Sequence, residues 1–245
     1  MVKQMVQRLS KGLGYEIKKW RPPTPTQVAE HDALQSVARY VRSIGQSLNV
    51  VFDVGANKGD YTAEVMALFP NARIFAFEPT PDVLVGLKSR YAGQQSVQVI
   101  DSAISDRDGT LTFHVRPNSV WNSMLPNDTS KIAPSESKEI HVRSTTIAAV
   151  ANEHQIEQVD LLKLDIQGAE MLALQGAAPL LSAAKIGFVQ LELNFWKIYA
   201  GQAEFKTVSR FMFDHGYWLQ GIYQASMTSG LLLSTDVVFA HNRYK

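Results

Sequence analysis

The stretch VFDVGANKGDYT, residues 51–62, decides the fold of this chain of 245 residues. It begins with an apolar run, continues through a turn between Gly55 and Gly59, and ends in residues that favour a helix. Glycines let a backbone turn tightly and come close to a ligand, and the first N–H groups of the following helix have no partner inside that helix. The stretch therefore predicts a β-strand, a ligand-binding turn and a helix at the start of an α/β domain.

The rest of the chain repeats this alternation of strand and helix. Nearly continuous β-branched or aromatic runs occupy residues 49–54, 73–77, 97–100, 160–165 and 188–193. Apolar residues with helical spacing appear in 60–69 and 82–91, where Pro81 suits a first helical turn. Strands that are apolar along their whole length are typical of parallel sheets that are buried on both faces. We therefore expect a doubly wound, mostly parallel sheet.

Two segments depart from this rhythm. Residues 109–115 and 139–144 alternate apolar with polar side chains, and the stretch between them is polar and contains prolines. This pattern predicts a hairpin-like insertion at about 109–144, whose long loop would serve as a lid over a substrate, since long loops in compact domains are more often functional than idle. Near the C-terminus, residues 217–223 and 236–241 predict an antiparallel hairpin that closes the edge of the sheet.

Composition limits the class of protein. The hydrophobic content of 45% and the charged content of 19% are typical of a soluble globular protein. A net charge of +1 gives no general attraction for nucleic acid. The absence of cysteine excludes disulfides and thiolate chemistry and agrees with a reducing compartment. The sequence has neither an apolar run long enough to span a membrane nor a signal-peptide centre, so we expect a cytoplasmic protein.

The first 25 residues differ from the domain that we expect at 26–245. Residues 1–21 carry six basic groups and one acidic group, and the residues that follow to position 25 form a proline-rich connector. Apolar residues recur every fourth position, which predicts a helix with a narrow apolar stripe: Met1, Met5, Leu9 and Leu13. We expect this helix to pack on its own domain or on a second copy of the chain, with contact to an anionic membrane surface as the alternative.

The residues around the turn narrow the choice of ligand. The turn contains neither the three-glycine dinucleotide pattern nor a loop ending in Gly-Lys-Ser/Thr. Glu78 ends the second strand, where its carboxylate can accept both hydroxyls of a ribose, and Pro79 fixes the exit of the chain. Asp53, together with the missing middle glycine, favours a ligand that has an ammonium group. These features indicate S-adenosylmethionine, and a nicotinamide dinucleotide is the alternative.

Four segments in order resemble the FkbM family of S-adenosylmethionine-dependent methyltransferases. They are Asp-Val-Gly-Ala-Asn-Lys-Gly at 53–59, Phe-Glu-Pro at 77–79, Ala-Ile-Ser-Asp at 103–106 with Gly109, and Leu-Lys-Leu-Asp-Ile-Gln-Gly-Ala-Glu at 162–170. The resemblance implies a class I methyltransferase fold, a Rossmann-like sheet of seven strands whose last strand is antiparallel. It also implies O-methylation of sugars, glycans, polyketides or related natural products.

The resemblance and the turn together give a set of residues expected to bind the cosubstrate. These are Asp53, Gly55, Asn57, Gly59, Thr62, Glu78, Pro79, Asp101, Ser102, Ala103 and Asp165. Glu is usual in the family where this chain has Gln167, so no charge at that position is carried over. Glu170 lies where it would serve the N-terminus of a helix.

Asp165 and Glu192 are the expected catalytic residues. Asp165 ends the fourth strand beside the point where open α/β sheets bind ligands. It could also cap a helix at 168–175, in place of a catalytic role or together with one. Either carboxylate could remove the proton of the acceptor hydroxyl, or the pair could hold a divalent metal ion, which we do not favour.

Substrate contacts are expected from two aromatic segments. Trp121, Asn122, Ser123 and Met124 lie in the insertion, and Asn194 and Trp196 follow the fifth strand. Aromatic and amide side chains together suit a sugar ring, although both segments could simply cover the ends of the sheet. Three functions remain open: a methyltransferase, which we favour, a nicotinamide-dependent oxidoreductase, and a noncatalytic protein that binds the cosubstrate as a partner subunit.

Overall fold

The computed structural model describes residues 32–128 and 137–244 of the chain. The helix and connector expected within residues 1–25 lie outside this range. Over the described residues, no helix combines the length and the apolar character that crossing a membrane requires.

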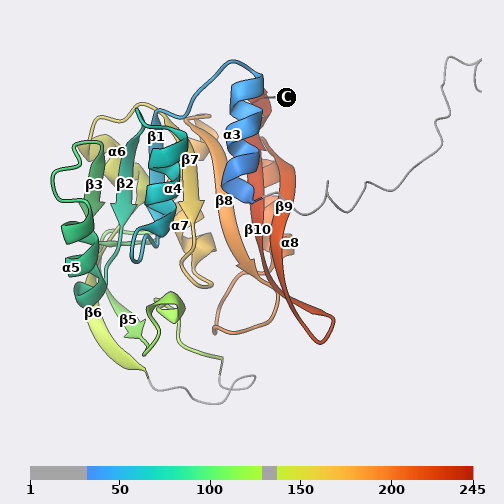
Figure 1. The fold of residues 1–245 in the computed structure, drawn as a ribbon. Coiled ribbons are helices and arrows are strands. Elements are labelled where there is room, and N and C mark those ends of the chain that lie inside the picture. Colours follow the sequence, from blue (N-terminus) through green and yellow to red (C-terminus); the bar gives the residue numbers. More distant parts are fainter. Residues whose placement is uncertain (1–31, 129–136, 245) are drawn as a thin grey trace, which may run out of the picture. The chain divides into compact units, whose positions relative to one another are not determined.

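The main element is a seven-stranded sheet with the strand order β3-β2-β1-β7-β8-β10-β9 (Figure 1). Neighbouring strands from β3 to β8 pair in parallel, whereas β10 pairs antiparallel with both β8 and β9. This order confirms the expected doubly wound sheet with an antiparallel C-terminal hairpin. The strands are β1 Val50–Val54, β2 Arg73–Phe77, β3 Val97–Ile100, β7 Val159–Leu164, β8 Ile186–Asn194, β9 Tyr217–Thr228 and β10 Leu231–His241.

Helices cover both faces of this sheet (Figure 1). The helices on one face are α3 Ala33–Ser43, α4 Asp60–Leu68 and α5 Pro81–Arg90, and those on the other are α6 Ile147–Glu153, α7 Glu170–Ser182 and α8 Phe205–Asp214. Successive residues of a strand point to opposite faces. Val51 therefore packs in the cluster with α3 and α4, while Phe52 packs in the cluster with α6, α7 and α8. Two apolar cores result, which explains why the strands are apolar along their whole length.

A second, three-stranded sheet stands beside the carboxyl ends of the main strands. Its strands are β4 Ala103–Ile104, β5 Gly109–Val115 and β6 Lys138–Thr145, in the order β4-β6-β5. β5 and β6 pair antiparallel from Gly109 with Ser144 to Val115 with Lys138, so the hairpin expected in the insertion is present. The described part of the loop between them contains a short 3-10 helix, η1 Ser119–Trp121. A second 3-10 helix, η2 Asn242–Tyr244, follows β10.

Candidate active site

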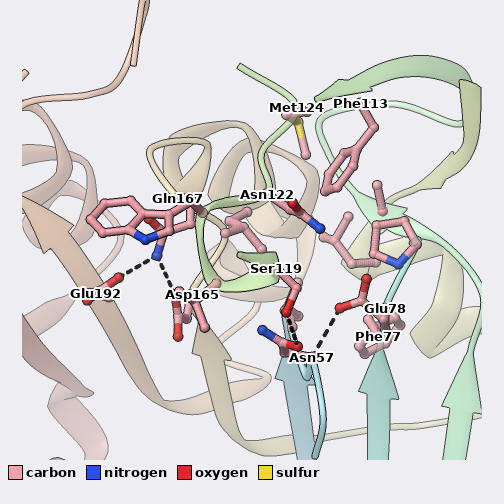
Figure 2. A pocket seen from close by; sticks show the side chains of 18 of the residues that line it. Asn57, Phe77, Glu78, Phe113, Ser119, Asn122, Met124, Asp165, Gln167 and Glu192 are labelled. Atoms are coloured by element: carbon pink, nitrogen blue, oxygen red, sulfur yellow. Dashed lines mark hydrogen bonds between the residues drawn. The ribbon is translucent and has the colours of Figure 1, made fainter. Parts of the chain in front are cut away.

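A cavity of about 240 Å³ lies at the carboxyl ends of β1, β2, β3, β7 and β8 (Figure 2). Parallel strands bring these ends to one edge of the sheet, and the insertion closes the cavity from the other side. The residues that line it are Val54, Gly55, Asn57, Phe77, Glu78, Pro79, Ser102, Ala103, Ile104, Phe113, Ser119, Val120, Trp121, Asn122, Met124, Asp165, Ile166, Gln167, Glu192, Asn194 and Ser234.

The cavity brings together most of the residues that the sequence singles out. Those that do not line it are Asp53, Gly59, Thr62, Asp101, Ser123 and Trp196. Ser119, Phe113 and Ser234 also line the cavity, although the sequence did not predict them as site residues. Phe113 is an inward residue of the alternating strand β5, so its pattern could have indicated a buried position. Ser234 lies opposite Asn194 in the antiparallel pair of β10 and β8, which no local pattern reveals.

Asp53 contacts other residues of the chain and does not line the cavity. It is fully buried, accepts a 2.7 Å hydrogen bond from the Thr62 hydroxyl, and lies 3.1 Å from the ammonium of Lys163. Lys163 is the register partner of Asp53 on the neighbouring strand, and it also donates to the carbonyl of Gly55 at 3.2 Å. The ammonium group that we expected Asp53 to receive from a ligand is thus supplied by the chain itself.

Burial and charge oppose one another at Lys163. Burial disfavours the charged form, but the nearby carboxylates of Asp53 and Asp165 outweigh it and raise the pKa of Lys163. Lys163 therefore remains a cation, and its ammonium also lies 3.6 Å from Asp165. The buried ammonium of Lys163 therefore connects Asp53 and Gly55, at the start of the turn, with Asp165 at the end of β7.

The two glycines of the turn are required by the protein's own packing. Gly55 has a φ of +78°, and a Cβ there would lie 2.0 Å from the backbone carbonyl oxygen of Asp165. Gly59 has a φ of +85°, and its Cβ would lie 2.5 Å from the ring of Tyr91. We expected both positions to leave room for a ligand. The structure corrects this reason, because the space of a Cβ is taken by the backbone of Asp165, directly after β7, at Gly55 and by α5 and the residue after it at Gly59.

Glu78 is a fixed carboxylate on the cavity wall. Its side chain is held by hydrogen bonds from the backbone N–H groups of Asn57 at 3.1 Å and Thr80 at 2.8 Å, and the residue is only 6% exposed. Burial raises the pKa of Glu78, and these hydrogen bonds oppose the rise. Each carboxylate oxygen can accept a further hydrogen bond. The Asn57 side chain in turn accepts from Ser119 at 3.0 Å, so the insertion is tied to the turn (Figure 2).

Gln167 joins the two expected catalytic carboxylates (Figure 2). Its amide nitrogen donates to Asp165 at 3.0 Å and to Glu192 at 2.7 Å, while its amide oxygen accepts from the Tyr199 hydroxyl at 2.9 Å. Burial and the neighbouring Asp165 raise the pKa of Glu192 to about 8. A glutamate at position 167 could not donate to both side chains, because a carboxylate has no donor and a protonated carboxyl group has only one, whereas the amide has two N–H groups.

The start of α7 tests the roles that we expected for Asp165 and Glu170 at the helix N-terminus. The helix begins at Glu170 after Ala169, without a side-chain cap, so the expectation that Asp165 caps a helix at 168–175 is wrong. Glu170 folds back and accepts from the backbone N–H groups of Ile166 at 3.2 Å and Gly168 at 3.1 Å. Burial raises the pKa of Glu170 to about 7. Glu170 therefore stabilises the backbone before α7, whereas Asp165 lines the cavity.

The insertion residues divide into two kinds. Ser123 is fully buried and donates to the backbone carbonyl of Gln167 at 2.8 Å, so it holds the loop in place. Trp121 lines the cavity and is 45% exposed. Asn194 also lines the cavity, and its side-chain nitrogen is buried without a hydrogen-bond partner among the described residues. Buried polar groups normally have partners, so this donor is suited to a ligand atom.

Metal binding has no support from side-chain geometry. Within residues 32–128 and 137–244, no three His, Asp or Glu side chains gather closely enough to hold an ion. Asp165 and Glu192 are bridged by the Gln167 amide, whose hydrogens point at both of them.

Comparison with known proteins identifies the family. Residues 53–219 match the methyltransferase FkbM domain. The chain belongs to this family of methyltransferases. The curated relatives of this methyltransferase include the 2-O-methyltransferase NoeI of Sinorhizobium fredii, 26% identical over 65% of this chain and 69% of NoeI. Another is the hexuronic acid methyltransferase AglP of Haloferax volcanii, 25% identical over 65% of this chain and 62% of AglP.

A solved structure supports the same fold. The methyltransferase FkbM from Methylobacillus flagellatus superposes with a TM-score of 0.52 at 15% identity, covering 78% of this chain and 43% of that chain. The shared architecture is the class I methyltransferase fold, in which the cavity lies at the carboxyl edge of the parallel strands. The protein is therefore a methyltransferase built on the expected sheet.

Proposed function

We propose that this FkbM-family methyltransferase transfers a methyl group from S-adenosylmethionine to a hydroxyl of a sugar, a glycan or a polyketide-type natural product. The observation that carries the proposal is that Glu78 lies in the same cavity as Asp165, Gln167 and Glu192. The Glu78 carboxylate suits a ribose, and the Asp165–Glu192 pair, held by Gln167, suits the removal of a proton from an acceptor.

The charge of the cavity favours this cosubstrate over a dinucleotide. Glu78 and Asp165 are acidic residues of the cavity wall, and no lysine or arginine is among the described residues that line it. An acidic wall would repel a pyrophosphate, whereas it attracts a cationic sulfonium and an ammonium. Beside Glu78, apolar side chains such as Ile104 and Phe113 offer a surface for a purine ring. S-adenosylmethionine, when bound, supplies an activated methyl group.

The residues of the chain then have two tasks, which are to orient the acceptor and to accept its proton. Asp165 has a side chain that is 39% exposed, so of the two acids it is better placed to meet a hydroxyl. Gln167 fixes the orientation of Asp165, and Lys163 stabilises its negative charge. Glu192, with a pKa of about 8, is mainly protonated at neutral pH. Asp165 is therefore the general base in this proposal, an effect worth about 10²–10⁴-fold in rate.

The acceptor class rests on the relatives and on the aromatic wall. NoeI is named as a 2-O-methyltransferase and AglP as a hexuronic acid methyltransferase, which support an oxygen acceptor on a sugar. In this chain Trp121 and Asn122 lie on the cavity wall beside the acids, and Asn194 offers its buried donor. An aromatic face and amide groups are suited to a sugar ring and its hydroxyls.

The proposal is tested in two steps. Binding is measured first by thermal unfolding with S-adenosylhomocysteine, NAD or NADP, and we expect only S-adenosylhomocysteine to raise the melting temperature. Transfer is then measured with isotopically labelled S-adenosylmethionine and a panel of sugars, where a product heavier by one methyl group is expected. Stabilisation by NAD alone would favour the oxidoreductase, and binding without transfer to any acceptor would favour a noncatalytic partner.

A further inference from the structure

A second hollow, the aromatic groove, lies next to the cavity. Its volume is about 460 Å³, and it is lined by Arg116, Pro117, Asn118, Trp121, Asn127, Trp196, Ile198 and Tyr199. Trp121 belongs to both hollows, so the groove continues the cavity. Trp121 is 45% exposed and Trp196 is 43% exposed. Two large aromatic side chains left open beside a reaction site indicate a surface that binds a ligand.

Backbone hydrogen bonds within the chain connect the two walls of the groove. One wall is the insertion and the other is the segment after β8, and their backbones pair through Asp128 N–H to Ile198 O at 2.9 Å and Ala200 N–H to Pro126 O at 2.9 Å. The guanidinium of Arg116 donates to the carbonyl of Trp121 and to the Asn127 side chain, and it lies 5.3 Å from the centre of the Tyr199 ring. A preformed groove loses little freedom when a ligand binds.

The groove is also connected to the catalytic carboxylates. The Tyr199 hydroxyl donates to the side chain of Gln167, which holds Asp165 and Glu192. The position of a ligand in the groove is therefore fixed relative to the general base. A ring that binds there would place the next ring of the same molecule in the cavity.

The chemistry of the lining favours a sugar ring over an acyl chain. Among the described residues of the lining, Pro117 and Ile198 alone are aliphatic, whereas the indoles present flat faces that carry partial negative charge. One face of a sugar ring is made of C–H groups with partial positive charge, which suits such a surface. The amides of Asn118 and Asn127 lie among the aromatic residues, where they can meet sugar hydroxyls.

We propose that the aromatic groove is a second subsite, which binds the sugar ring adjacent to the one that is methylated. The acceptor is then an oligosaccharide or a larger glycan, and a single sugar fills only part of the site. This inference rests on the proposed function, because it needs the acceptor hydroxyl to lie in the cavity.

The test compares short and long sugars on the full chain saturated with S-adenosylhomocysteine. The probes are chitotriose, cellotriose and trigalacturonic acid, each paired with its own monosaccharide, and binding is measured by titration calorimetry. We expect at least one trisaccharide to bind about tenfold or more tightly than its monosaccharide, a difference of about 1.4 kcal/mol. Trp196→Ala should remove that difference while leaving the affinity for S-adenosylhomocysteine within a few-fold.

Phe195→Ala is the matched control. Phe195 is the neighbouring residue in the same loop and is 41% exposed, but it stacks on Phe205 and does not line the groove. We expect this variant to keep the preference for the trisaccharide. Loss of the preference in both variants would mean that general damage to the loop, and not the groove, is responsible, and would overturn the proposal.

Three other outcomes separate this inference from the proposed function. Equal affinity for trisaccharide and monosaccharide in all three pairs overturns the subsite, even if S-adenosylhomocysteine binds. Tighter binding of decanoic acid than of any trisaccharide would replace the sugar ring with an acyl chain and would also overturn it. Failure to bind S-adenosylhomocysteine contradicts the proposed function itself.

Discussion

At the scale of single residues, Glu78 is the most directly testable contact with the cosubstrate. Its carboxylate is held by the backbone of Asn57 and Thr80 and keeps acceptor capacity toward the cavity. We expect Glu78→Gln to weaken the binding of S-adenosylhomocysteine by about 1.5–3 kcal/mol, because hydrogen bonds to a charged acceptor are lost. The measurement is titration calorimetry of the folded variant.

Glu78→Gln is preferred to Glu78→Ala because Gln keeps an oxygen for one of the backbone N–H groups. A thermal unfolding curve close to that of the wild type provides the control for folding. Unchanged affinity in a folded variant would exclude Glu78 as a ligand of the ribose.

The second residue prediction concerns Asp165. Asp165→Asn removes the basic group, and we expect turnover to fall by about 10²–10⁴-fold while the affinity for S-adenosylhomocysteine stays within a few-fold. Kinetic constants with an accepted sugar provide the measurement. A parallel assay of the wild type with EDTA tests a metal, since only a metal-dependent enzyme would lose activity and regain it with Mg²⁺.

A wild-type turnover rate in Asp165→Asn would assign the proton transfer to another group. The first alternative would be Glu192, whose raised pKa makes it the next candidate above about pH 8.

At the scale of elements, the close approach of the first turn to the end of β7 is decisive. A Cβ at Gly55 would lie 2.0 Å from the carbonyl oxygen of Asp165. We expect Gly55→Ala to destabilise the fold by about 3 kcal/mol or more, because a strained φ adds to a backbone clash. The free energy of unfolding in urea is the quantity to measure.

Gly93→Ala is the control for the conformational part of this loss. Gly93 has a φ of +85°, similar to that of Gly55, but no atom of the described residues lies within 4 Å of its added Cβ. It should cost only the roughly 1–2 kcal/mol of a left-handed residue. If both variants lose the same free energy, the contact between the turn and β7 contributes nothing.

The elements themselves are largely predictable from local pattern. β2 and β3 begin and end where the apolar runs do, and α5 begins at Pro81. The hairpin β5–β6 was visible because its strands have one exposed face and therefore alternate. The predicted start of α7 at residue 168 was wrong, because the helix begins at Glu170. The Glu170 side chain accepts hydrogen bonds from the backbone N–H groups of Ile166 and Gly168 and forms a turn that no local sequence pattern indicates.

At the scale of the whole molecule, buried acids make stability depend on pH. Burial and Asp165 raise the pKa of Glu192 from an ordinary 4.5 to about 8, so the folded state holds this proton more tightly than the unfolded state. The stabilisation is complete below about pH 4.5 and is lost as the pH rises through about 8. Buried Glu170 and half-buried Asp236, with pKa values of about 7 and 6, add to the same trend.

We therefore expect Glu192→Gln to melt with less dependence on pH than the wild type between about pH 5 and 9. Thermal unfolding across this range is the measurement, and Glu157→Gln, at an exposed surface position, is the control that should follow the wild type. A variant that loses as much stability with rising pH as the wild type would show that Glu192 does not hold its proton in the folded state.

The sequence by itself determined the strands, the doubly wound order, the closing hairpin, and the positions of Glu78 and Asp165 at strand ends. The strands follow from patterns within single segments, because the periodicity of a strand or helix reports which of its own faces is buried. The doubly wound sheet and its hairpin follow from the order in which such segments succeed one another along the chain. The four ordered segments between residues 53 and 170 also indicated the FkbM family, which the match over residues 53–219 confirms.

Only the tertiary structure decided which side chains meet. Asp53 and Lys163 are far apart in the chain, yet strand register places them side by side, so the ammonium that Asp53 needs comes from within. Gln167 joins Asp165 to Glu192 because β7 and β8 are neighbours in the sheet. The aromatic groove likewise exists only where the insertion pairs with the segment after β8. A local pattern records the burial of its own residues, and their partners are fixed by the packing of the whole sheet.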